Sequence, residues 1–267
     1  MKKYRFLIAR RFTQLSIIAL YILANIYGIN ILMGNLSSSL VLQTVPLSDP
    51  FAVLQMIFAG AIISFDIALG ALIISIFYFI LGGRAFCSWV CPVNIITDSA
   101  NYLRRVLKFD EVQKKQPATR NLRYWLILIS FIISYFMGVA AFELISPVSM
   151  VHRGLIFGLG FGLATMIVIF LFDLFVLKNG WCGHICPLGG FYSLIGRFSL
   201  LRVHHNSEKC TACMKCKVVC PEIQVLHMID KSSEPVLQEC TLCARCIEVC
   251  EDDALNFELR NYMKEKK

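Results

Sequence analysis

Two segments in the C-terminal part of the chain repeat one cysteine spacing, and no other feature restricts the possible folds as strongly. CTACMKCKVVCP begins at Cys210 and CTLCARCIEVCE begins at Cys240, and both follow the pattern C-x2-C-x2-C-x3-C. Three thiolates on a tight turn can cap three irons of a cubane, while the fourth cysteine, one helical turn further on, points elsewhere. Zinc sites use four ligands as pairs, and disulfides are disfavoured in a reducing cytoplasm. The spacing therefore predicts iron–sulfur clusters.

Residues 200–260 resemble the two-cluster bacterial ferredoxins, in which the fourth cysteine of each motif ligates the other cluster. The resemblance implies two [4Fe–4S] clusters, one held by Cys210, Cys213, Cys216 and Cys250, the other by Cys240, Cys243, Cys246 and Cys220. Pro221 follows the first motif as in that family, whereas Glu251 replaces the proline after the second. In this small α+β domain we expect strands near 201–205 and 254–259, with two short helices carrying the cysteines.

Upstream of these motifs the chain is too apolar for an ordinary soluble domain. Of its 267 residues, 57% are hydrophobic and only 16% are charged. Residues 13–48 contain no Asp, Glu, Lys or Arg, a run far longer than the roughly 20 residues that a helix needs to cross a bilayer. We therefore expect an all-α bundle of four transmembrane helices in two duplicated hairpins. The four helices are expected near residues 15–34, 64–83, 124–143 and 155–177.

The apolar stretch from Pro50 to Gly83 is too long for one crossing. Counting back roughly 18 to 20 residues from Arg84 uses up the bilayer near Asp66, the one charged residue in the stretch. Residues 51–63 are thus expected to form a separate interfacial or re-entrant helix. A single long, tilted helix is the alternative.

The basic residues predict the orientation in the membrane. Thirteen lysines and arginines flank one side of the expected spans, within residues 2–11 and 84–123, and only Arg153 lies on the other side. This asymmetry predicts that both termini are cytoplasmic, and it accounts for the net charge of +8 without a nucleic-acid partner. The expected organisation is a basic cytoplasmic N-terminus (1–14), a transmembrane domain (15–190) and a cytoplasmic ferredoxin-like domain (191–267).

Each expected hairpin ends in a second kind of cysteine motif, C-x3-C-P. FCSWVCPVN covers residues 86–94 and WCGHICPLG covers residues 181–189, which indicates an internal duplication. Cysteines at i and i+4 share one face if the helix continues through them. We predict that the four thiols converge at the cytoplasmic mouth of the bundle; they are Cys87, Cys91, Cys182 and Cys186. A metal or cluster site, a redox dithiol and a contact with the ferredoxin domain remain open, and four small apolar residues at helix ends are the alternative.

Several local stretches agree with one known family. They are GNLSSSL at 34–40, TVPLSDP at 44–50, FCSWVCPVNIITD at 86–98, SPVS at 146–149 and GWCGHICPLG at 180–189. Together with the expected spans and the two-cluster domain, they resemble the polyferredoxin family of bacterial inner membranes, and within it the ferredoxin-type NapH family of the periplasmic nitrate reductase system. The resemblance runs through nearly the whole chain.

That resemblance implies a multi-pass component of a quinol dehydrogenase in the bacterial inner membrane. It would move electrons from membrane quinol towards a periplasmic nitrate reductase, as an oxidoreductase subunit without a self-contained substrate site. The implied partners are the iron–sulfur protein NapG and the tetrahaem cytochrome NapC. The clusters are expected in the cytoplasm, whereas the nitrate reductase is periplasmic. Electrons from the clusters would therefore have to return through the membrane, or the clusters would serve electron input, sensing or coupling. Two other functions remain open: a copper-reducing oxidase-assembly factor and a redox-sensing scaffold without turnover.

A quinol site needs a proton acceptor near the membrane surface. On the outer side the sequence offers Asp49, Gln55, Asp66, Glu143 and His152. Ionisable groups in or near spans are functional candidates, and we expect Asp66 to be the acceptor. Asp49 suits a turn, and Glu143 and His152 suit solvated loops. We expect Asp173, near the inner end of the fourth span, to reach water, and His184 to face away from the thiols of its motif.

Overall fold

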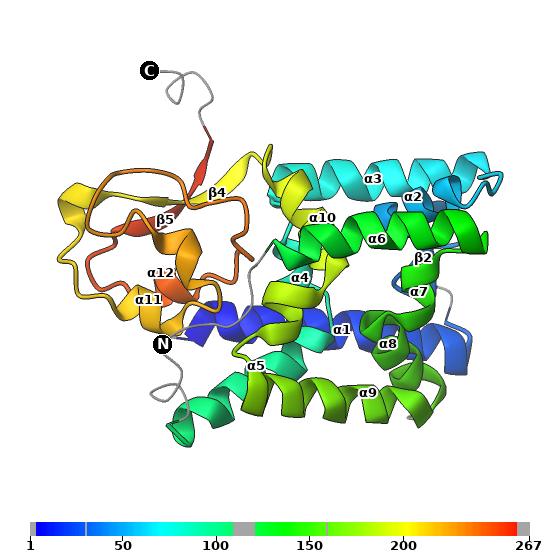
Figure 1. Ribbon diagram of the computed structural model, residues 1–267, viewed down its shortest axis with the longest axis horizontal. Coiled ribbons are helices and arrows are strands. Elements are labelled where there is room, and N and C mark those ends of the chain that lie inside the picture. The colour runs from blue at the N-terminus through cyan, green and yellow to red at the C-terminus, as the bar shows by residue number, and fades with distance from the viewer. Residues whose placement is uncertain (1–3, 30, 109–120, 159, 261–267) are drawn as a thin grey trace. The chain divides into compact units, whose positions relative to one another are not determined.

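The chain forms two compact units, and both combine segments that are distant in the sequence. The computed structural model describes residues 4–29, 31–108, 121–158 and 160–260 (Figure 1). The cysteine-rich unit comprises Met1–Thr13, Phe77–Val90 and Tyr192–Lys267, and the helical unit comprises Gln14–Ile76 and Cys91–Phe191. Five basic residues of the orientation argument lie outside the described residues: Lys2, Lys3, Lys114, Lys115 and Arg120.

The helical unit consists mainly of helices joined by short connections. Its helices are α2 (Pro50–Phe58), α5 (Val93–Val106), α6 (Leu122–Met137), α7 (Ala141–Ile145), α8 (Pro147–Phe157), α9 (Gly160–Leu171) and the π-helices η3 (Phe172–Val176) and η4 (Trp181–Ile185). Three more helices pass from one unit into the other: α1 (Arg5–Tyr27), α3 (Phe65–Leu81) and α10 (Pro187–Gly196). Within the helical unit α9 packs against α8 and α5, and α6 packs against α2 and α7.

Apolar helices occupy all four segments that were expected to span the membrane. Among the described residues, α1 is the one helix that is long and apolar enough to cross a bilayer. The other three, Phe65–Leu81, Leu122–Met137 and Gly160–Val176, have 10–17 residues, against roughly 20 for a full crossing. The helices are therefore confirmed, whereas four complete spans stay a prediction.

The first predicted span, 15–34, is wrong at its C-terminal end, and the helical region is not purely α. Helix α1 ends at Tyr27 and is followed by a three-stranded antiparallel sheet of β1 (Leu32–Gly34), β2 (Ser38–Val41) and β3 (Val45–Ser48). Gly28, with a φ of 69°, lies just after the helix, and Leu42 and Gln43, with φ of 50° and 61°, form the turn between β2 and β3. An uncharged run does not distinguish a span from a small apolar sheet, since both lack charge.

Helix α2 confirms that a separate helix precedes α3. The carboxylate of Asp49 caps it by accepting hydrogen bonds from the amides of Phe51 and Ala52, at 3.4 and 3.3 Å. Pro50 occupies the first position of the helix without the loss of a hydrogen bond, because the first amide of a helix has no partner within it. Helix α8 also begins with a proline, Pro147, although its N-cap residue forms no side-chain cap hydrogen bond. The structure thus repeats the duplication in the sequence, while the interfacial position of α2 stays a prediction.

Four arginines that entered the charge asymmetry are buried, with exposed fractions of 0–2%: Arg10, Arg84, Arg104 and Arg123. In the helical unit, Arg104 Nη1 donates to the carbonyls of Asp173 and Leu174 at 3.2 and 2.8 Å. These carbonyls lie near the end of η3, where helical partners run out. Arg104 therefore stabilises the end of η3 in addition to its contribution to the charge asymmetry.

The cysteine-rich unit contains the expected α+β fold (Figure 1). Strand β4 (Leu201–His205) pairs antiparallel with β5 (Leu255–Leu259), and α11 (Lys215–Val219) packs against α12 (Arg245–Glu248). These are the two strands and the two cysteine-bearing helices that the sequence predicted, so this part is confirmed. The same unit also includes the start of α1, the end of α3, helix α4 (Ala85–Trp89) and the end of α10.

Aromatic rings fix α4 within this unit. Phe86 stacks on Tyr192 with ring centroids 4.9 Å apart, and Tyr78 meets the two rings edge-on at 5.9 and 5.1 Å. Gly83 permits the close approach, because a Cβ at that position would collide with the Tyr192 carbonyl. The helix that carries Cys87 is therefore held in the unit that contains the eight ferredoxin-like cysteines.

Candidate iron–sulfur centre

Both ferredoxin-like cysteine loops have the same backbone conformation. Ala212 and Met214 in the first loop, and Leu242 and Ala244 in the second, have φ between 53° and 59°. Residues other than glycine rarely adopt this left-handed conformation, and they keep it where the surrounding structure enforces it, often at functional sites. Alternating left- and right-handed residues turn successive amides towards one concave face, which favours anions. A thiolate-ligated cluster fits such a loop.

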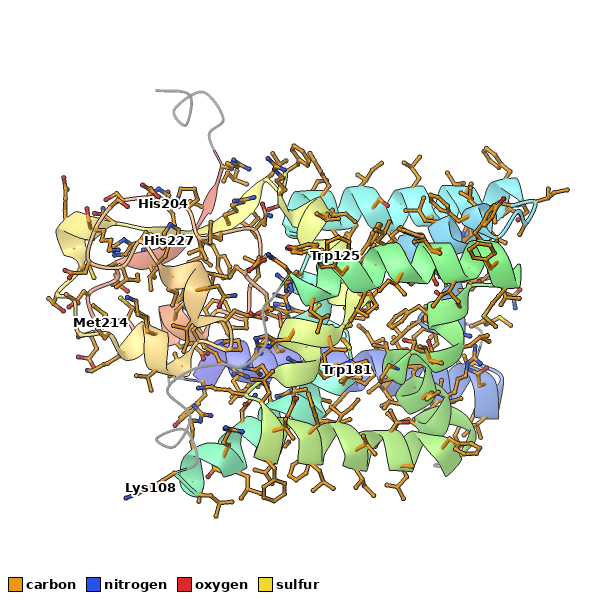
Figure 2. All side chains as sticks on the ribbon, viewed as in Figure 1. Lys108, Trp125, Trp181, His204, Met214 and His227 are labelled. Carbon is orange, nitrogen blue, oxygen red and sulfur yellow. The ribbon has the colours of Figure 1, made fainter. Side chains whose placement is uncertain are left out.

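The first set of cysteines surrounds a small cavity. Cys210, Cys213, Cys216 and Cys250 line a space of about 20 Å³, together with Met214 (labelled in Figure 2). Three of the thiols belong to the first motif, and Cys250 belongs to the second. The structure therefore brings together the four cysteines that the ferredoxin resemblance grouped. Cys213 is exposed, so this set lies at the surface of the unit.

The second set lies deeper. Burial raises the pKa of the Cys240 thiol to about 12, and the charge of Cys243 adds to this effect. Burial is the main cause that raises the pKa of Cys246; the charges of Cys240, Cys243 and Cys220 add to it, and that of Cys216 adds least. These four thiols are thus within electrostatic reach of one another. Burial likewise raises the pKa of Cys220. A bound cationic group would favour such buried thiols as thiolates.

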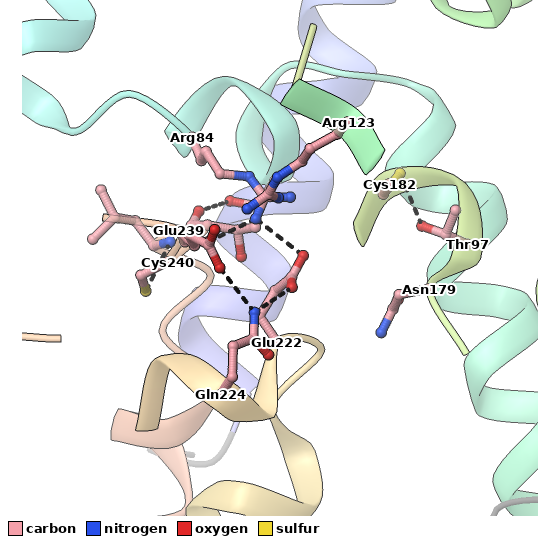
Figure 3. A network of polar contacts seen from close by, with 12 residues as sticks. Arg84, Thr97, Arg123, Asn179, Cys182, Glu222, Gln224, Glu239 and Cys240 are labelled. Atoms are coloured by element: carbon pink, nitrogen blue, oxygen red, sulfur yellow. Dashed lines mark hydrogen bonds and ion pairs between the residues drawn. The ribbon is translucent and has the colours of Figure 1, made fainter. Parts of the chain in front are cut away.

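Helix α4 and its N-cap residue, Arg84, bind the second loop through three side-chain donors. The bonds run from Arg84 Nη1 to the Glu239 carbonyl (2.7 Å), from Ser88 Oγ to the Thr241 carbonyl (2.6 Å) and from Trp89 Nε1 to the Leu242 carbonyl (3.1 Å). Arg84 also forms an ion pair of 3.0 Å with Glu222, and both side chains are buried (Figure 3). The first C-x3-C-P motif is therefore bound directly to the loop that contains Cys240 and Cys243.

Neither C-x3-C-P motif forms a continuous helix, so the condition under which each cysteine pair would share one helical face is not met. Cys87 lies in α4 and Cys182 lies in η4, but both helices end before the second cysteine. Cys186 is extended, with φ −62° and ψ 110°. The cause is the proline that follows, which disfavours the helical conformation of the residue before it.

The four C-x3-C-P cysteines divide between the two units. Cys87 belongs to the cysteine-rich unit, and Cys91, Cys182 and Cys186 belong to the helical unit. None of the four forms a disulfide within the described residues. In the helical unit Cys182 Sγ lies 4.0 Å from Thr97 Oγ1 on α5 (Figure 3). Their convergence into one site stays a prediction.

Two groups that were expected in solvated loops lie in helices and have specific contacts. Glu143 Oε1 accepts hydrogen bonds from the hydroxyls of Ser37 and Ser149, at 2.5 and 2.6 Å. His152 is buried and meets the Tyr21 ring edge-on at 4.7 Å. Burial, helped by the charge of Arg153, lowers the pKa of His152 to about 4.

Asp66 lies exposed in the first turn of α3, and its role as a proton acceptor stays a prediction. Gln55, another outer-side candidate, is buried, and its Oε1 accepts hydrogen bonds from the Phe142 amide at 2.9 Å and from the Ser134 hydroxyl at 3.3 Å. His184, for which a surface role was open, is also buried.

Asp173 is a further candidate proton acceptor. It was expected to reach water, but it is fully buried in η3. Its Oδ1 accepts a hydrogen bond from the Trp181 amide at 3.1 Å, and its Oδ2 has no hydrogen-bond partner within the described ranges. Phe172 and Trp181 line an apolar cavity of about 550 Å³, together with residues of α8, α9 and η4. The signal in the sequence was the position of this lone carboxylate nine residues before Cys182, the first cysteine of a C-x3-C-P motif.

Comparisons with known proteins agree with the cysteine chemistry. A family model described as a 4Fe-4S binding domain matches residues 53–110 and 159–204, and one described as a 4Fe-4S dicluster domain matches residues 202–251. The ferredoxin-type protein NapH of Haemophilus influenzae is 41% identical over 262 residues, which cover 96% of this chain and 90% of that protein. The chain belongs to this family of ferredoxin-type proteins. It is thus an iron–sulfur electron-transfer protein.

Other family members extend the comparison. NapH of Escherichia coli is 39% identical over 97% of this chain and 91% of its own length. The methylamine utilization ferredoxin-type protein MauN of Methylorubrum extorquens is 41% identical over 81% of this chain and 75% of its own length. No solved structure matches the chain.

Proposed function

We propose that this protein carries electrons from membrane quinol towards a periplasmic nitrate reductase. The observation that carries the proposal is the pair of cysteine loops with one shared backbone conformation in a chain that aligns with NapH proteins over 96–97% of its length. The identity to MauN is similar, but that alignment covers 81% of the chain. The expected partners are the iron–sulfur protein NapG and the tetrahaem cytochrome NapC.

Two [4Fe–4S] clusters would supply one-electron carriers, with crossed ligation as in two-cluster ferredoxins. Cys210, Cys213, Cys216 and Cys250 would hold the first cluster, and Cys240, Cys243, Cys246 and Cys220 the second. The shared cavity of the first set and the mutual electrostatic influence within the second support this grouping. The protein itself holds the thiols together, turns loop amides towards them and limits the access of water to the second set.

The apolar cavity beside Trp181 supports quinol as the electron donor. Its volume of about 550 Å³ lies in the range of roughly 300–1,000 Å³ of small-molecule sites. Asp66 and Asp173 are the two candidate acceptors for the quinol protons. Asp173 neighbours the cavity through Phe172, whereas Asp66 lies exposed at the start of α3.

The C-x3-C-P cysteines are proposed to form a redox or metal site between membrane and clusters. The 4Fe-4S binding domain model covers both motifs, at 86–94 and 181–189, and ends before the ferredoxin-like cysteines begin. Replacing Cys182 and Cys186 by serine should stop quinol-dependent cluster reduction while the iron content of the C-terminal domain stays unchanged. Normal cluster reduction in this variant would show that the second C-x3-C-P motif takes no part in electron transfer from quinol.

The membrane orientation is also part of the proposal. The first turn of α1, the last turn of α3 and the two-cluster fold belong to one unit, which supports a common side for the N-terminus and the clusters. With the positive-inside rule, that side is the cytoplasm. Reporter fusions at residues 40 and 150 should report the periplasm, and a fusion after residue 260 the cytoplasm.

A deletion strain tests the function in cells. Membranes without this protein should lose quinol-dependent nitrate reduction, and the wild-type gene should restore it, whereas a gene with Cys243→Ser should not. Loss of copper-oxidase activity instead would favour the assembly-factor alternative. Nitrate reduction and oxidase activity that both remain normal would leave the scaffold alternative as the better account.

A further inference from the structure

The two cysteine loops differ in what surrounds them, although their backbones match. The first loop is exposed at Thr211, Cys213 and Lys215, whereas Leu242 and Cys243 of the second loop are buried. The described part of the cysteine-rich unit places a buried ion pair beside the second loop and an exposed one beside the first. The two loops therefore offer clusters of the same ligand chemistry in two electrostatic environments.

The donors of α4 determine how the second loop is presented. Side chains of Arg84, Ser88 and Trp89 each bind one loop carbonyl, as given above. The C=O and N–H of one peptide group point in opposite directions. When a loop carbonyl points towards α4, the amide of the same peptide therefore points towards the thiols. The Leu242 amide accordingly donates to Cys240 Sγ at 3.4 Å. Hydrogen bonds to the sulfurs are one determinant of a cluster's reduction potential, and net charge is another.

Arg84 and Glu222 place opposite charges next to this loop. Arg84 binds the carbonyl of Glu239, the residue before Cys240, and Glu222 lies two residues after Cys220. The Arg84–Glu222 side chains are 0% and 2% exposed, so water screens their charges little. Gln224 Nε2 donates to Glu222 Oε2 at 3.0 Å and helps to hold this carboxylate in place (Figure 3).

We propose that Arg84 and Glu222 are opposed positioning residues that set the reduction potential of the second cluster and separate it from that of the first. This rests on the proposed function, since it presupposes both clusters. Reduction adds one electron, and hence one negative charge, to a cluster. The guanidinium stabilises that charge and raises the potential, whereas the carboxylate lowers it. Arg84 comes three residues before Cys87, so the residue that tunes the second cluster lies just before the first C-x3-C-P motif.

The test is a redox titration of the full-length protein, followed by EPR. The two clusters are assigned by the signal that is lost in Cys213→Ser and in Cys243→Ser. Arg84→Gln should shift the potential of the second cluster negatively, and Glu222→Gln should shift it positively. Arg84→Lys keeps the charge and should restore most of the wild-type potential. None of these changes should move the first cluster.

Lys215 provides the matched control. It pairs with Glu251 at 2.7 Å beside the first loop, but the two side chains are 54% and 79% exposed. Because solvent and salt screen such a pair, Lys215→Gln should shift the first cluster far less than Arg84→Gln shifts the second.

Unchanged potentials in Arg84→Gln and Glu222→Gln, or equal shifts of both clusters, would overturn the proposal. If Arg84→Gln does not assemble its cluster, Glu222→Gln decides alone, and an unshifted second cluster in it overturns the proposal. Absence of two clusters in the wild-type protein would instead contradict the proposed function.

Discussion

The Glu248 carboxylate, on α12 between Cys246 and Cys250, accepts a hydrogen bond of 2.6 Å from the Phe6 amide at the start of α1. The Leu7 amide donates to the same oxygen at 3.3 Å. The first amides of a helix have no partner within it, and a carboxylate both satisfies them and balances the helix dipole. The start of α1 is therefore hydrogen-bonded to the second cysteine motif.

Replacing Glu248 by Ala should destabilise the cysteine-rich unit by about 1 kcal/mol, the typical cost of a lost N-terminal cap. The apparent Tm of the purified protein in detergent should fall, and the amides of Phe6 and Leu7 should exchange faster. Glu251→Ala is the control, because that side chain is 79% exposed and pairs only with Lys215 among the described contacts. Equal effects of the two changes would contradict a capping role.

Gly83→Ala should destabilise the same unit by roughly 1–3 kcal/mol, the usual cost of overpacking. The added methyl would collide with the Tyr192 carbonyl and the Gly196 amide, and would push α4 away from α10. Gly138→Ala serves as the control, since that Cβ would meet nothing within 4 Å and its φ of 66° adds only backbone strain. A smaller loss of Tm in Gly83→Ala than in Gly138→Ala would show that the contact is not tight.

The stability of the helical unit should fall as the pH decreases from about 6.5 to about 4. His152 has a pKa of about 4 in the folded protein because burial disfavours the imidazolium, whereas the unfolded chain takes up the proton near pH 6.5. The unfolded state thus binds more protons in this window, and stability is full above it and declines through it. The expected loss is at most roughly 3 kcal/mol.

His152→Phe should flatten the dependence of Tm on pH in this window, because Phe keeps an aromatic ring against Tyr21 but takes up no proton. His227→Asn removes an exposed imidazole from the other unit and is the matched control. A pH profile that is the same in His152→Phe and in the wild type would contradict the assignment.

Asp173→Asn should slow quinol-dependent cluster reduction by about 100-fold, the usual contribution of a positioned proton acceptor. Asn can still accept the hydrogen bond from the Trp181 amide, so the fold and the iron content should be unchanged. Asp66→Asn is measured beside it under the same quinol concentration. A large effect confined to Asp66→Asn would assign the acceptor to the start of α3 instead.

The parts of the fold that depend on local chemistry could be predicted from the sequence. The resemblance to two-cluster ferredoxins, which rests on the cysteine spacing, predicted β4, β5, α11 and α12. The break ahead of α3 was also predicted correctly, since bilayer thickness limits the length of an apolar helix. Hydrophobicity alone failed at residues 32–48, where a short sheet satisfies the backbone as well as a helix would.

The rest of the candidate site depends on contacts between distant segments. Nothing in the sequence around Arg84 shows that its side chain would bind the carbonyl of Glu239 rather than remain a flanking charge. The same holds for Asp173, which lies close to a helix end in the sequence but is buried by tertiary packing. The end of η4 before Cys186 could be predicted from the sequence, because the restriction by Pro187 is local.

The central claim is that membrane quinol reduces clusters held by the eight C-terminal cysteines. The most direct test adds a soluble quinol analogue to the anaerobically purified, oxidised protein in lipid nanodiscs and follows the iron–sulfur absorbance together with EPR. The account predicts about eight irons per chain and a bleaching of the absorbance that depends on the quinol and is lost in the Cys182→Ser/Cys186→Ser variant. Clusters that stay oxidised with quinol, yet are reduced by dithionite, would contradict it.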